Sequence, residues 1–566
     1  MPRCRSALVT AALAVVVLLG TFVATPSVAA AAPTVPDYGA AIDPFAAYVG
    51  QTTCDPTDKP GTVALRDLLE ATYPATTPIG ISRACSVGGQ SEHKEGRAYD
   101  WGVNAFDPAQ KALADDFLAW LLATDRYGNV NAMARRFGLM YVIWNNQVWK
   151  SYGTNRGWQP YTGAVPHTDH VHFSQSWDGA YKRTSYYAYT APPAPPVAFH
   201  PVAPARILDT RPATQVGPFG SPWGQGVSRE VAVTGVGGVP SGAQAVALNV
   251  TVTGTSAGGY LSVWPAGQSR PVASSLNWSA GQTIAHAVTA KVGTAGQVAV
   301  FNEAGSAHVV VDVVGYYDAA AGDGFTPLTP ARILDTRAGQ PTAWVEGEVK
   351  AVPVTGLGGV PAGADAVVAN VTVTGTTGDG GFLSIWPSGQ PQSSASNLNW
   401  AAGDTVANAV TMDPGPDGKV SVFNAAGAAQ VIIDVVGWFA PGSGQLFHPL
   451  DPARIQDSRP GSKVGPYGTP WGAGTTRPVQ VADAGGVPAG ADAVLMNVTA
   501  TGTSGASFLA VWPAGQAEPN ASSLNWRAGQ TISNAVTTML SAGGSTSVAN
   551  AGGNAEVIAD AAGWYG

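Results

Sequence analysis

Pro204-Ala205-Arg206-Ile207-Leu208-Asp209-Thr210-Arg211 is the stretch that decides the fold of most of this chain, because it occurs three times. It returns unchanged at 330–337 and as PARIQDSR at 452–459, so the copies are 126 and 122 residues apart. A period of that length exceeds the unit of a solenoid or a propeller and equals a small domain. The sequence therefore predicts three related domains in a row.

The residues between the copies repeat as well, in a pattern of strands and turns. Each copy contains Gly-Gly-Val-Pro, Asn-Val-Thr, Trp-Pro, Leu-Asn-Trp and a closing Asp-x-x-Gly in that order. Residues 246–252 alternate apolar and small polar side chains, 309–314 are mostly Val, and Gly and Pro recur without helical periodicity. We expect each repeat, over 199–318, 325–440 and 446–566, to be a β-sandwich or barrel.

Two recurring groups have a structural and a functional interpretation. Asp209 between Arg206 and Arg211, like its counterparts, is more typical of a structural ion pair near a sheet edge than of a ligand site. Trp264 and its counterparts lie in strand patterns and are expected in the core. Trp278 and its counterparts precede Gly turns, where projecting rings could stack on sugars.

The region before the repeats has a different sequence pattern. Residues 33–187 mix helical and strand patterns, and 108–124 place apolar residues on one helical face. A Pro-rich segment, 188–198, then reads as a stiff extended linker. The fold class that we predict is a multidomain chain, with an α+β domain followed by three all-β repeat domains.

The N-terminus indicates export. Arg3 and Arg5 precede a short apolar run, and small residues then supply a cleavage site, so 1–32 are predicted to be a secretory signal peptide. The mature chain would keep Cys54 and Cys85, an even number that favours one disulfide in an exported protein, whereas a metal site would need more thiols. We therefore expect a secreted protein, extracellular or associated with the cell wall.

The charge balance excludes some partners. The 29 Lys and Arg residues against 37 Asp and Glu give a formal net charge of −8, and loss of Arg3 and Arg5 would make the chain more acidic. Without a basic cluster it lacks the electrostatic pattern of a nucleic-acid binder, and anionic membranes and wall polymers would repel it. If it binds a surface, it must use hydrogen bonds and aromatic rings.

Two short segments contain most of the reactive side chains. They are Ser91-Glu92-His93-Lys94-Glu95-Gly96-Arg97-Ala98-Tyr99-Asp100 and His167-Thr168-Asp169-His170-Val171-His172, which hold four of the eight histidines. On a strand, His170 and His172 face the same side. Two imidazoles and a carboxylate can hold a catalytic metal and leave one position open. The helical His-Glu-x-x-His zinc pattern is absent from the sequence.

These segments resemble a known family. Ser91-x-His93-x-x-Gly96-x-Ala98-x-Asp100 followed by Asp169-x-x-His172 is similar to the D-alanyl-D-alanine carboxypeptidase/hedgehog-type zinc peptidases, which include cell-wall endopeptidases and phage endolysins. The resemblance covers roughly residues 78–176. It implies that His93, Asp100 and His172 bind Zn²⁺.

The resemblance also implies roles for four further residues. The family's usual base is a Glu three residues before the last ligand, where this chain has Asp169. Because His167, His170 and His172 resemble a segment of penicillin-insensitive murein endopeptidases, the base is Asp169 or His167, and we favour Asp169. Arg83 resembles the family's upstream Arg, and Arg83 or His170 would support the developing oxyanion.

The leading hypothesis is a secreted zinc-dependent carboxypeptidase or endopeptidase that hydrolyses peptide bonds in peptidoglycan stem peptides. The repeats would hold it at the envelope, with cell-wall glycan as a candidate ligand and three copies acting multivalently. The alternative is a non-catalytic surface-binding or adhesion protein that zinc stabilises. Asp169 favours the enzyme, because a structural site needs no base.

Overall fold

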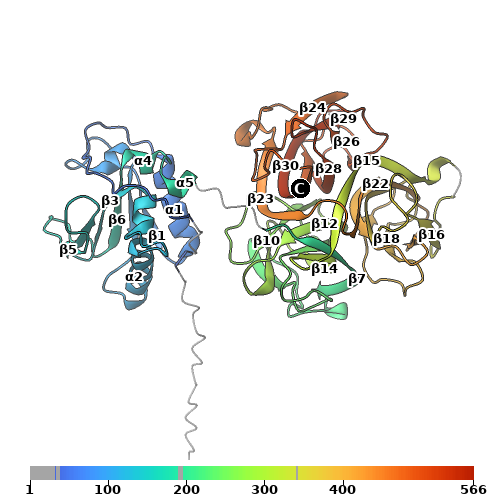
Figure 1. Ribbon diagram of the computed structural model, residues 1–566, viewed down its shortest axis with the longest axis horizontal. Coiled ribbons are helices and arrows are strands. Elements are labelled where there is room, and N and C mark those ends of the chain that lie inside the picture. Colours follow the sequence, from blue (N-terminus) through green and yellow to red (C-terminus); the bar gives the residue numbers. More distant parts are fainter. Residues whose placement is uncertain (1–31, 34–37, 189–194, 339–341) are drawn as a thin grey trace, which may run out of the picture. The chain divides into compact units, whose positions relative to one another are not determined.

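The computed structural model describes residues 32–33, 38–188, 195–338 and 342–566. The chain forms two compact units, Met1–Ala191 and Pro192–Gly566 (Figure 1). The predicted signal peptide lies outside the described residues except for Ala32, and so do residues 189–194 of the predicted linker.

No helix in the described ranges is long and apolar enough to cross a membrane.

The first unit is built on one antiparallel sheet with the strand order β1-β2-β6-β3-β4-β5. Its strands are β1 (Thr77–Gly80), β2 (Ala98–Gly102), β3 (Leu139–Trp144), β4 (Gln147–Lys150), β5 (Gln159–Pro160) and β6 (His170–Gln175). Its helices are α1 (Pro60–Thr72), α2 (Pro108–Leu122), α3 (Ala132–Arg136), α4 (Trp177–Ala180), α5 (Ser185–Ala188) and the 3₁₀ helix η1 (Glu92–Glu95).

Strands β2 and β6 divide their side chains between two faces of the sheet. Successive residues of a strand point to opposite faces, so each strand can supply a core and a polar surface at once. The apolar side chains pack with Leu65 of α1 and Phe117 of α2 in one cluster; they are Tyr99, Trp101, Val171 and Phe173. The alternate residues are polar, namely Asp100, His170, His172 and Ser174.

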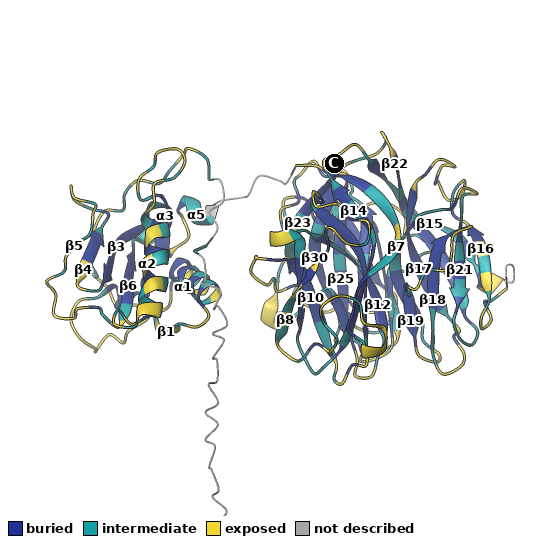
Figure 2. Cartoon of the chain, turned by 90° about the horizontal axis from the view of Figure 1, so that it is seen from below, coloured by how far each residue is buried: buried dark blue, intermediate teal, exposed yellow. Residues whose placement is uncertain are grey.

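The helix predicted over 108–124 is confirmed as α2. Phe117, Leu118 and Leu121 are buried on its inner face, while much of its outer face is exposed (Figure 2). Asp107 caps the helix by accepting hydrogen bonds from the backbone N–H groups of Ala109 and Gln110.

The predicted disulfide between Cys54 and Cys85 is confirmed, with the two Cα atoms 5.9 Å apart. Both linked segments also hydrogen-bond to η1, since Asp55 N donates to Lys94 O and Arg83 N donates to His93 O. The disulfide therefore holds the two segments that frame η1.

The second unit contains all three repeats, each with eight strands. Repeat 1 has β7 (Ala198–Asp209), β8 (Val227–Ala232), β9 (Ala245–Thr253), β10 (Gly259–Pro265), β11 (Leu276–Trp278), β12 (Ile284–Lys291), β13 (Gln297–Asn302) and β14 (His308–Asp318). Repeat 2 has β15 (Asp323–Asp335), β16 (Val349–Pro353), β17 (Ala366–Thr374), β18 (Gly381–Pro387), β19 (Leu398–Trp400), β20 (Val406–Met412), β21 (Lys419–Asn424) and β22 (Gln430–Pro441). Repeat 3 has β23 (Phe447–Asp457), β24 (Thr475–Gln480), β25 (Ala493–Thr501), β26 (Ser507–Pro513), β27 (Leu524–Trp526), β28 (Ile532–Met539), β29 (Ser545–Asn550) and β30 (Glu556–Tyr565). Short 3₁₀ helices complete them: η2 (Pro212–Thr214), η3 (Thr294–Gly296), η4 (Thr336–Ala338) and η5 (Pro460–Ser462).

Within each repeat an inner and an outer four-stranded sheet pack face to face around a Val-rich core. The inner sheets have the orders β12-β9-β14-β7, β15-β22-β17-β20 and β23-β30-β25-β28. The outer sheets have the orders β11-β10-β13-β8, β16-β21-β18-β19 and β24-β29-β26-β27. Each repeat is therefore a β-sandwich.

The three inner sheets meet around a shared centre. Strands β7 and β15 pair, which joins the inner sheets of repeats 1 and 2 into one eight-stranded sheet. Bridges from Val197 to Phe447 and from Phe325 to Gln445 connect repeat 3 to both. One buried cluster takes aromatic side chains from every repeat, namely Phe199, Tyr317, Phe325, Phe439, Phe447 and Tyr565.

The Asn of each Asn-Val-Thr motif links its repeat to the next. The Asn249 side-chain amide donates to Ser396 O, that of Asn370 to Ser522 O, and that of Asn497 to Ser274 O. Repeat 1 thus contacts repeat 2, repeat 2 contacts repeat 3, and repeat 3 contacts repeat 1. The three copies form a closed ring, as identical head-to-tail contacts do when the rotation closes.

The predicted fold class is wrong. The chain is mostly β, with 43% of its residues in strands and 11% in helices, and an α+β domain ahead of the repeats is not what the structure shows. The helical periodicity of 108–124 is clear in the sequence and led us to expect more helix than the domain has. The short strands at 98–102, 139–150 and 170–175 have no comparably clear sequence pattern. Only α1 and α2 exceed five residues in the described part of the chain. The repeats are all-β, as expected.

The recurring tryptophans and the ion pairs of the recurring arginines have structural roles. Trp264 and its counterparts are buried as expected, but Trp278, Trp400 and Trp526 are also buried and cannot project toward a sugar. Asp209 has no exposed surface and accepts from Arg211, while Arg206 pairs with the buried Asp312 at 2.9 Å. The ion-pair interpretation of this group is therefore supported.

We predict that replacing both cysteines by Ser destabilises the first unit by about 3 kcal/mol, because the disulfide closes a loop with a sequence separation of 31 residues. Hydrogen exchange should show faster opening of the β2 and β6 amides, with the β30 amides of the same protein as the internal control. Unchanged protection of β2 and β6 would mean that the disulfide adds no stability.

Candidate metal centre

Three side chains from the two sequence segments converge on one point. Strands β2 and β6 pair with Asp100 directly opposite His172, and η1 places His93 beside both. His93 Nε2 lies 3.1 Å from Asp100 Oδ2 and 3.3 Å from His172 Nδ1. His172 Nδ1 lies 2.8 Å from Asp100 Oδ1, and all three side chains are buried.

Gly96 makes this convergence possible. It follows η1 with φ +64°, a left-handed conformation that ends the helix and turns the chain into β2. A Cβ atom at this position would lie 2.0 Å from Thr57 O. The backbone of 57–58 therefore packs where only glycine fits, and the short turn brings His93 back over Asp100.

Hydrogen bonds on the far side of each imidazole fix which nitrogen faces the centre. His93 Nδ1 lies 2.6 Å from Ile81 O, and His172 Nε2 lies 3.0 Å from Ser174 Oγ. Since a carbonyl oxygen only accepts, His93 carries its proton on Nδ1 and presents a lone pair on Nε2. Donation from His172 Nε2 to Ser174 leaves the Nδ1 lone pair of His172 for the centre.

The protonation states suit a metal ion. Burial alone would raise the pKa of Asp100, but its contacts with the His172 and His93 rings, whose facing nitrogens can carry a proton while no metal is bound, lower it well below its usual value. Burial lowers the pKa of His172, although Asp100 opposes the change. The site therefore presents an ionised carboxylate and a neutral imidazole near pH 7, the forms that coordinate metals.

The spacing of the ligand atoms also suits a metal ion. Tetrahedral coordination with bonds of about 2.0–2.1 Å separates neighbouring ligand atoms by about 3.3 Å. The two imidazole nitrogens are 3.3 Å apart, His172 Nδ1 is 2.8 Å from Asp100 Oδ1, and His93 Nε2 is 3.1 Å from Asp100 Oδ2. The buried group His93, Asp100 and His172 could therefore hold a metal ion.

His170 lies beside this group and connects it to Asp169. His170 Nε2 is 3.6 Å from Asp100 Oδ1, and His170 Nδ1 is 2.7 Å from Asp169 Oδ1, which lowers the pKa of Asp169. The Asp169 side chain is 79% exposed. Among the contacts of the described residues, Asp169 reaches the ligand group only through His170.

His167 forms part of the wall. It is buried with φ 53°, and its ring centre lies 4.7 Å from that of His170 and 5.7 Å from that of His172. Its Nδ1 lies 2.6 Å from Val165 O, and burial lowers its pKa to about 4. His167 is therefore a neutral neighbour of the centre.

The remaining predicted residues divide between the site and the core. Arg83 is exposed on the loop whose backbone bonds to His93. Trp149 has no exposed surface and Trp144 only 5%, so both belong to the core.

Three residues of the site were missed from the sequence. Ser174 orients His172, the Tyr141 ring stacks on the His172 ring with centres 5.5 Å apart, and Tyr141 Oη donates to Glu92 Oε2 at 2.7 Å. The period of two in His170, His172 and Ser174 could have identified the serine. Tyr141 comes from β3, and no pattern in the sequence connects it to β6.

Residues 54–172 match the protein family described as "VldE, C-terminal domain". The match begins at the disulfide cysteine Cys54 and ends at His172, so it includes all three candidate ligands. No curated protein matches the chain.

We predict that Ser174→Ala lowers metal affinity by about 10- to 100-fold, because His172 loses the acceptor that fixes its tautomer. Competition between the protein and a chelator measures this, and Ser82→Ala on the exposed loop is the control. Equal affinity of the two variants would show that Ser174 does not orient the ligand.

Proposed function

We propose that this chain is a secreted zinc-dependent peptidase that hydrolyses peptide bonds in peptidoglycan stem peptides. The observation that carries the proposal is the buried group of two imidazoles and a carboxylate with a His170–Asp169 pair beside it. The likeness of both segments to the D-alanyl-D-alanine carboxypeptidase/hedgehog-type peptidases supports the choice of substrate.

Zinc is the metal that this donor set favours. Two imidazole nitrogens and one carboxylate with an open fourth position are typical of catalytic zinc, whereas Ca²⁺ and Mg²⁺ prefer sites made of oxygen atoms. His93 Nε2, Asp100 and His172 Nδ1 would hold the ion. When bound, zinc lowers the pKa of a coordinated water toward neutrality and polarises the scissile carbonyl.

The chain's own groups would move the proton and bind the substrate. We assign proton acceptance to the Asp169–His170 pair, in which His170 Nε2 faces the ligand group while Asp169 accepts the Nδ1–H and stabilises the imidazolium. Arg83 is available to a substrate carboxylate or to the developing oxyanion. His167, which is buried, shields the other side of His170 from water.

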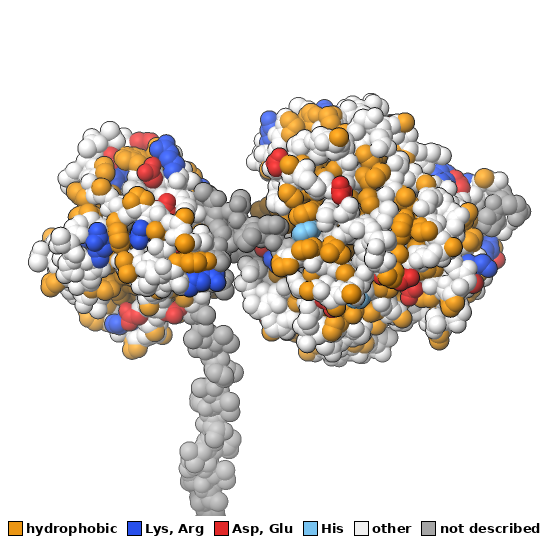
Figure 3. Space-filling model, viewed as in Figure 1, with side chains coloured by type: hydrophobic (Ala, Val, Ile, Leu, Met, Phe, Trp, Pro, Cys, Tyr) orange, Lys and Arg blue, Asp and Glu red, His pale blue; other side chains and the backbone are white. Residues whose placement is uncertain are grey.

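The other features of the chain are consistent with a function at the cell wall. A disulfide is consistent with an extracellular protein. In Figure 3 the second unit presents mainly apolar and uncharged side chains, with charged ones scattered. We assign to the repeats the role of holding the chain at the wall through hydrogen bonds and apolar contacts.

We predict that the mature protein binds one zinc ion and releases fragments from purified peptidoglycan. His172→Ala should lose both properties while the β amides of the repeats keep their hydrogen-exchange protection. Metal analysis and mass spectrometry of the released fragments measure the two properties. Stoichiometric zinc without hydrolysis would favour the alternative of a zinc-stabilised surface-binding protein, and zinc retained in a His93→Ala, His172→Ala double variant would contradict the ligand assignment.

We predict that Asp169→Asn and His170→Gln keep zinc and each lower kcat by on the order of 10²-fold or more, because both interrupt proton acceptance. His167→Ala should keep most of its turnover. Steady-state rates on a soluble peptidoglycan fragment test this. An inactive His167→Ala beside an active Asp169→Asn would identify His167 as the base instead.

A further inference from the structure

An open cleft lies between repeats 2 and 3. It encloses about 300 Å³ and is lined by residues of β15, η4, β17 and β22 and by Thr405 in repeat 2, and by Phe508 and residues between 518 and 525 in repeat 3. The lining is mostly polar, and its apolar members are Ile432, Phe508, Pro519 and Ala521. The charged and amide side chains in it include Arg332, Arg337, Glu518 and Asn525.

Arg332 lines the cleft, and its counterparts at the other two interfaces of the ring, Arg206 and Arg454, are covered by the neighbouring repeat. Arg206 Nη2 donates to Ser394 O of repeat 2, and Arg454 Nη2 donates to Val272 O of repeat 1. At the third interface, the hydrogen bonds of Arg332 within the described residues go only to Asp335 and Asp434 of its own repeat. The neighbour's segment thus leaves this guanidinium open to the cleft.

A side-chain amide in the cleft has free donors. Asn525 lines the cleft and its Oδ1 accepts from Ser522 Oγ, while its amide N–H groups make no hydrogen bond to the described residues. A ligand oxygen can therefore accept from Asn525 without breaking a bond within the protein. The hydroxyl of Thr372 is also unpaired, but it is fully buried and the equivalent hydroxyls of Thr251 and Thr499 are unpaired too, so it belongs to the repeat and not to the cleft.

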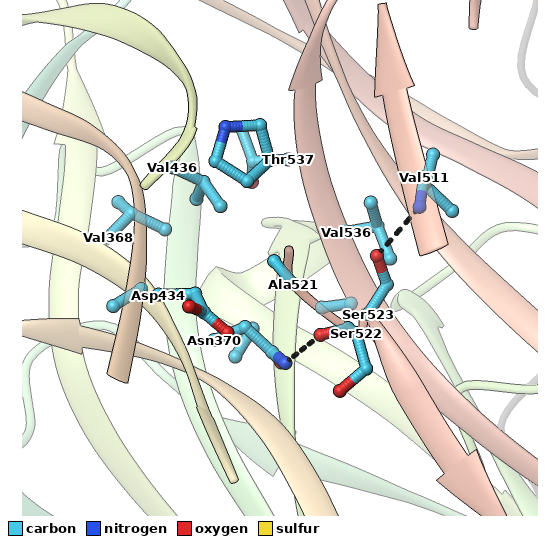
Figure 4. Close-up of a pocket in the computed structure, with 14 residues that line it drawn as sticks. Val368, Asn370, Asp434, Val436, Val511, Ala521, Ser522, Ser523, Val536 and Thr537 are labelled. Carbon is cyan, nitrogen blue, oxygen red and sulfur yellow. Dashed lines mark hydrogen bonds between the residues drawn. The ribbon is translucent and has the colours of Figure 1, made fainter. Parts of the chain in front are cut away.

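Hydrogen bonds in an adjoining cavity hold one wall of the cleft in place. Figure 4 shows the adjoining cavity, where Asn370 donates to Ser522 O and Val511 N donates to Ser523 Oγ. This cavity shares Ala521 and Ser522 with the cleft but encloses only about 20 Å³, room for about one water molecule. The cleft, not this cavity, has the size of a ligand site.

The charges of the cleft are balanced, which decides the class of ligand. Arg332 pairs with Asp434 at 2.8 Å, Arg337 pairs with Asp335 at 2.7 Å, and Glu518 adds a negative charge. An anion would meet no net positive charge. Hydroxyl, amide and guanidinium groups beside the Phe508 ring suit an uncharged, polyhydroxylated molecule with apolar C–H faces.

We infer that the cleft between repeats 2 and 3 is a binding site for an uncharged segment of an oligosaccharide. The inference rests on the proposed wall-binding role of the repeats and is independent of the metal centre. The sugar hydroxyls hydrogen-bond to Asn525 and the open edge of Arg332, and one ring face packs on Phe508.

The experiment uses the full chain and two probes, a tetrasaccharide of N-acetylglucosamine and purified cell walls. Asn525→Ala removes the free amide donors, so affinity for the tetrasaccharide should fall by about tenfold. Asn277→Ala is the matched control, because Asn277 also accepts from a Ser hydroxyl and lies at an interface where the arginine is covered. Phe508→Ala and its counterpart Tyr260→Ala form a second pair.

Calorimetry with the tetrasaccharide and sedimentation with walls separate the outcomes. Weaker binding of both probes by Asn525→Ala and Phe508→Ala, but not by the controls, at salt up to about 0.5 M supports the cleft. Wall binding that all four variants keep would overturn the cleft while the wall-binding role stands. Loss of wall binding in the cleft variants without any binding of the tetrasaccharide would overturn the ligand class, and wild-type protein that binds neither probe would overturn the role itself.

Discussion

The pairing of β2 with β6 is the constraint on which the metal centre depends. Because the register sets Asp100 opposite His172, one face of the pair carries these two candidate metal ligands and the other carries the apolar core. A slip of one residue would exchange the faces, so the burial of Trp101 and Phe173 enforces the position of the ligands. Core packing thus supplies the free energy that holds a carboxylate and two imidazoles together before any metal binds.

The ligands could be predicted from the sequence, but their surroundings could not. His93 and Asp100 lie on either side of the turn at Gly96, and local spacing is enough to relate them. The role of His170 depends on the pairing of β6 with β2, which places it between Asp169 and Asp100. From the sequence alone Asp169 was the natural base, since distance along the chain does not show that its carboxylate is mostly exposed.

The repeats were recognisable as β-sandwiches, whereas their assembly was not. The Asn of each Asn-Val-Thr motif is a short polar residue in an apolar strand, a pattern that predicts neither face nor partner. Its partner is a backbone carbonyl in another repeat, more than 140 residues away for Asn249 and Asn370. Trp278 is misleading for a similar reason: the Gly turn after it suggests exposure, but its ring belongs to the buried core cluster.

Closure of the ring changes what three copies can do. Multivalent binding needs three equivalent sites that are open together. Ser394 O accepts from Arg206 and Val272 O accepts from Arg454, so these two arginines are covered. Asn520 occupies the equivalent position opposite Arg332 and leaves that guanidinium open to the cleft. Two interfaces therefore serve mainly to close the ring and bury apolar surface, and divergence at one interface opens a cleft. Since head-to-tail contacts with this rotation close only after three copies, all three repeats are needed to hold even a single cleft rigid.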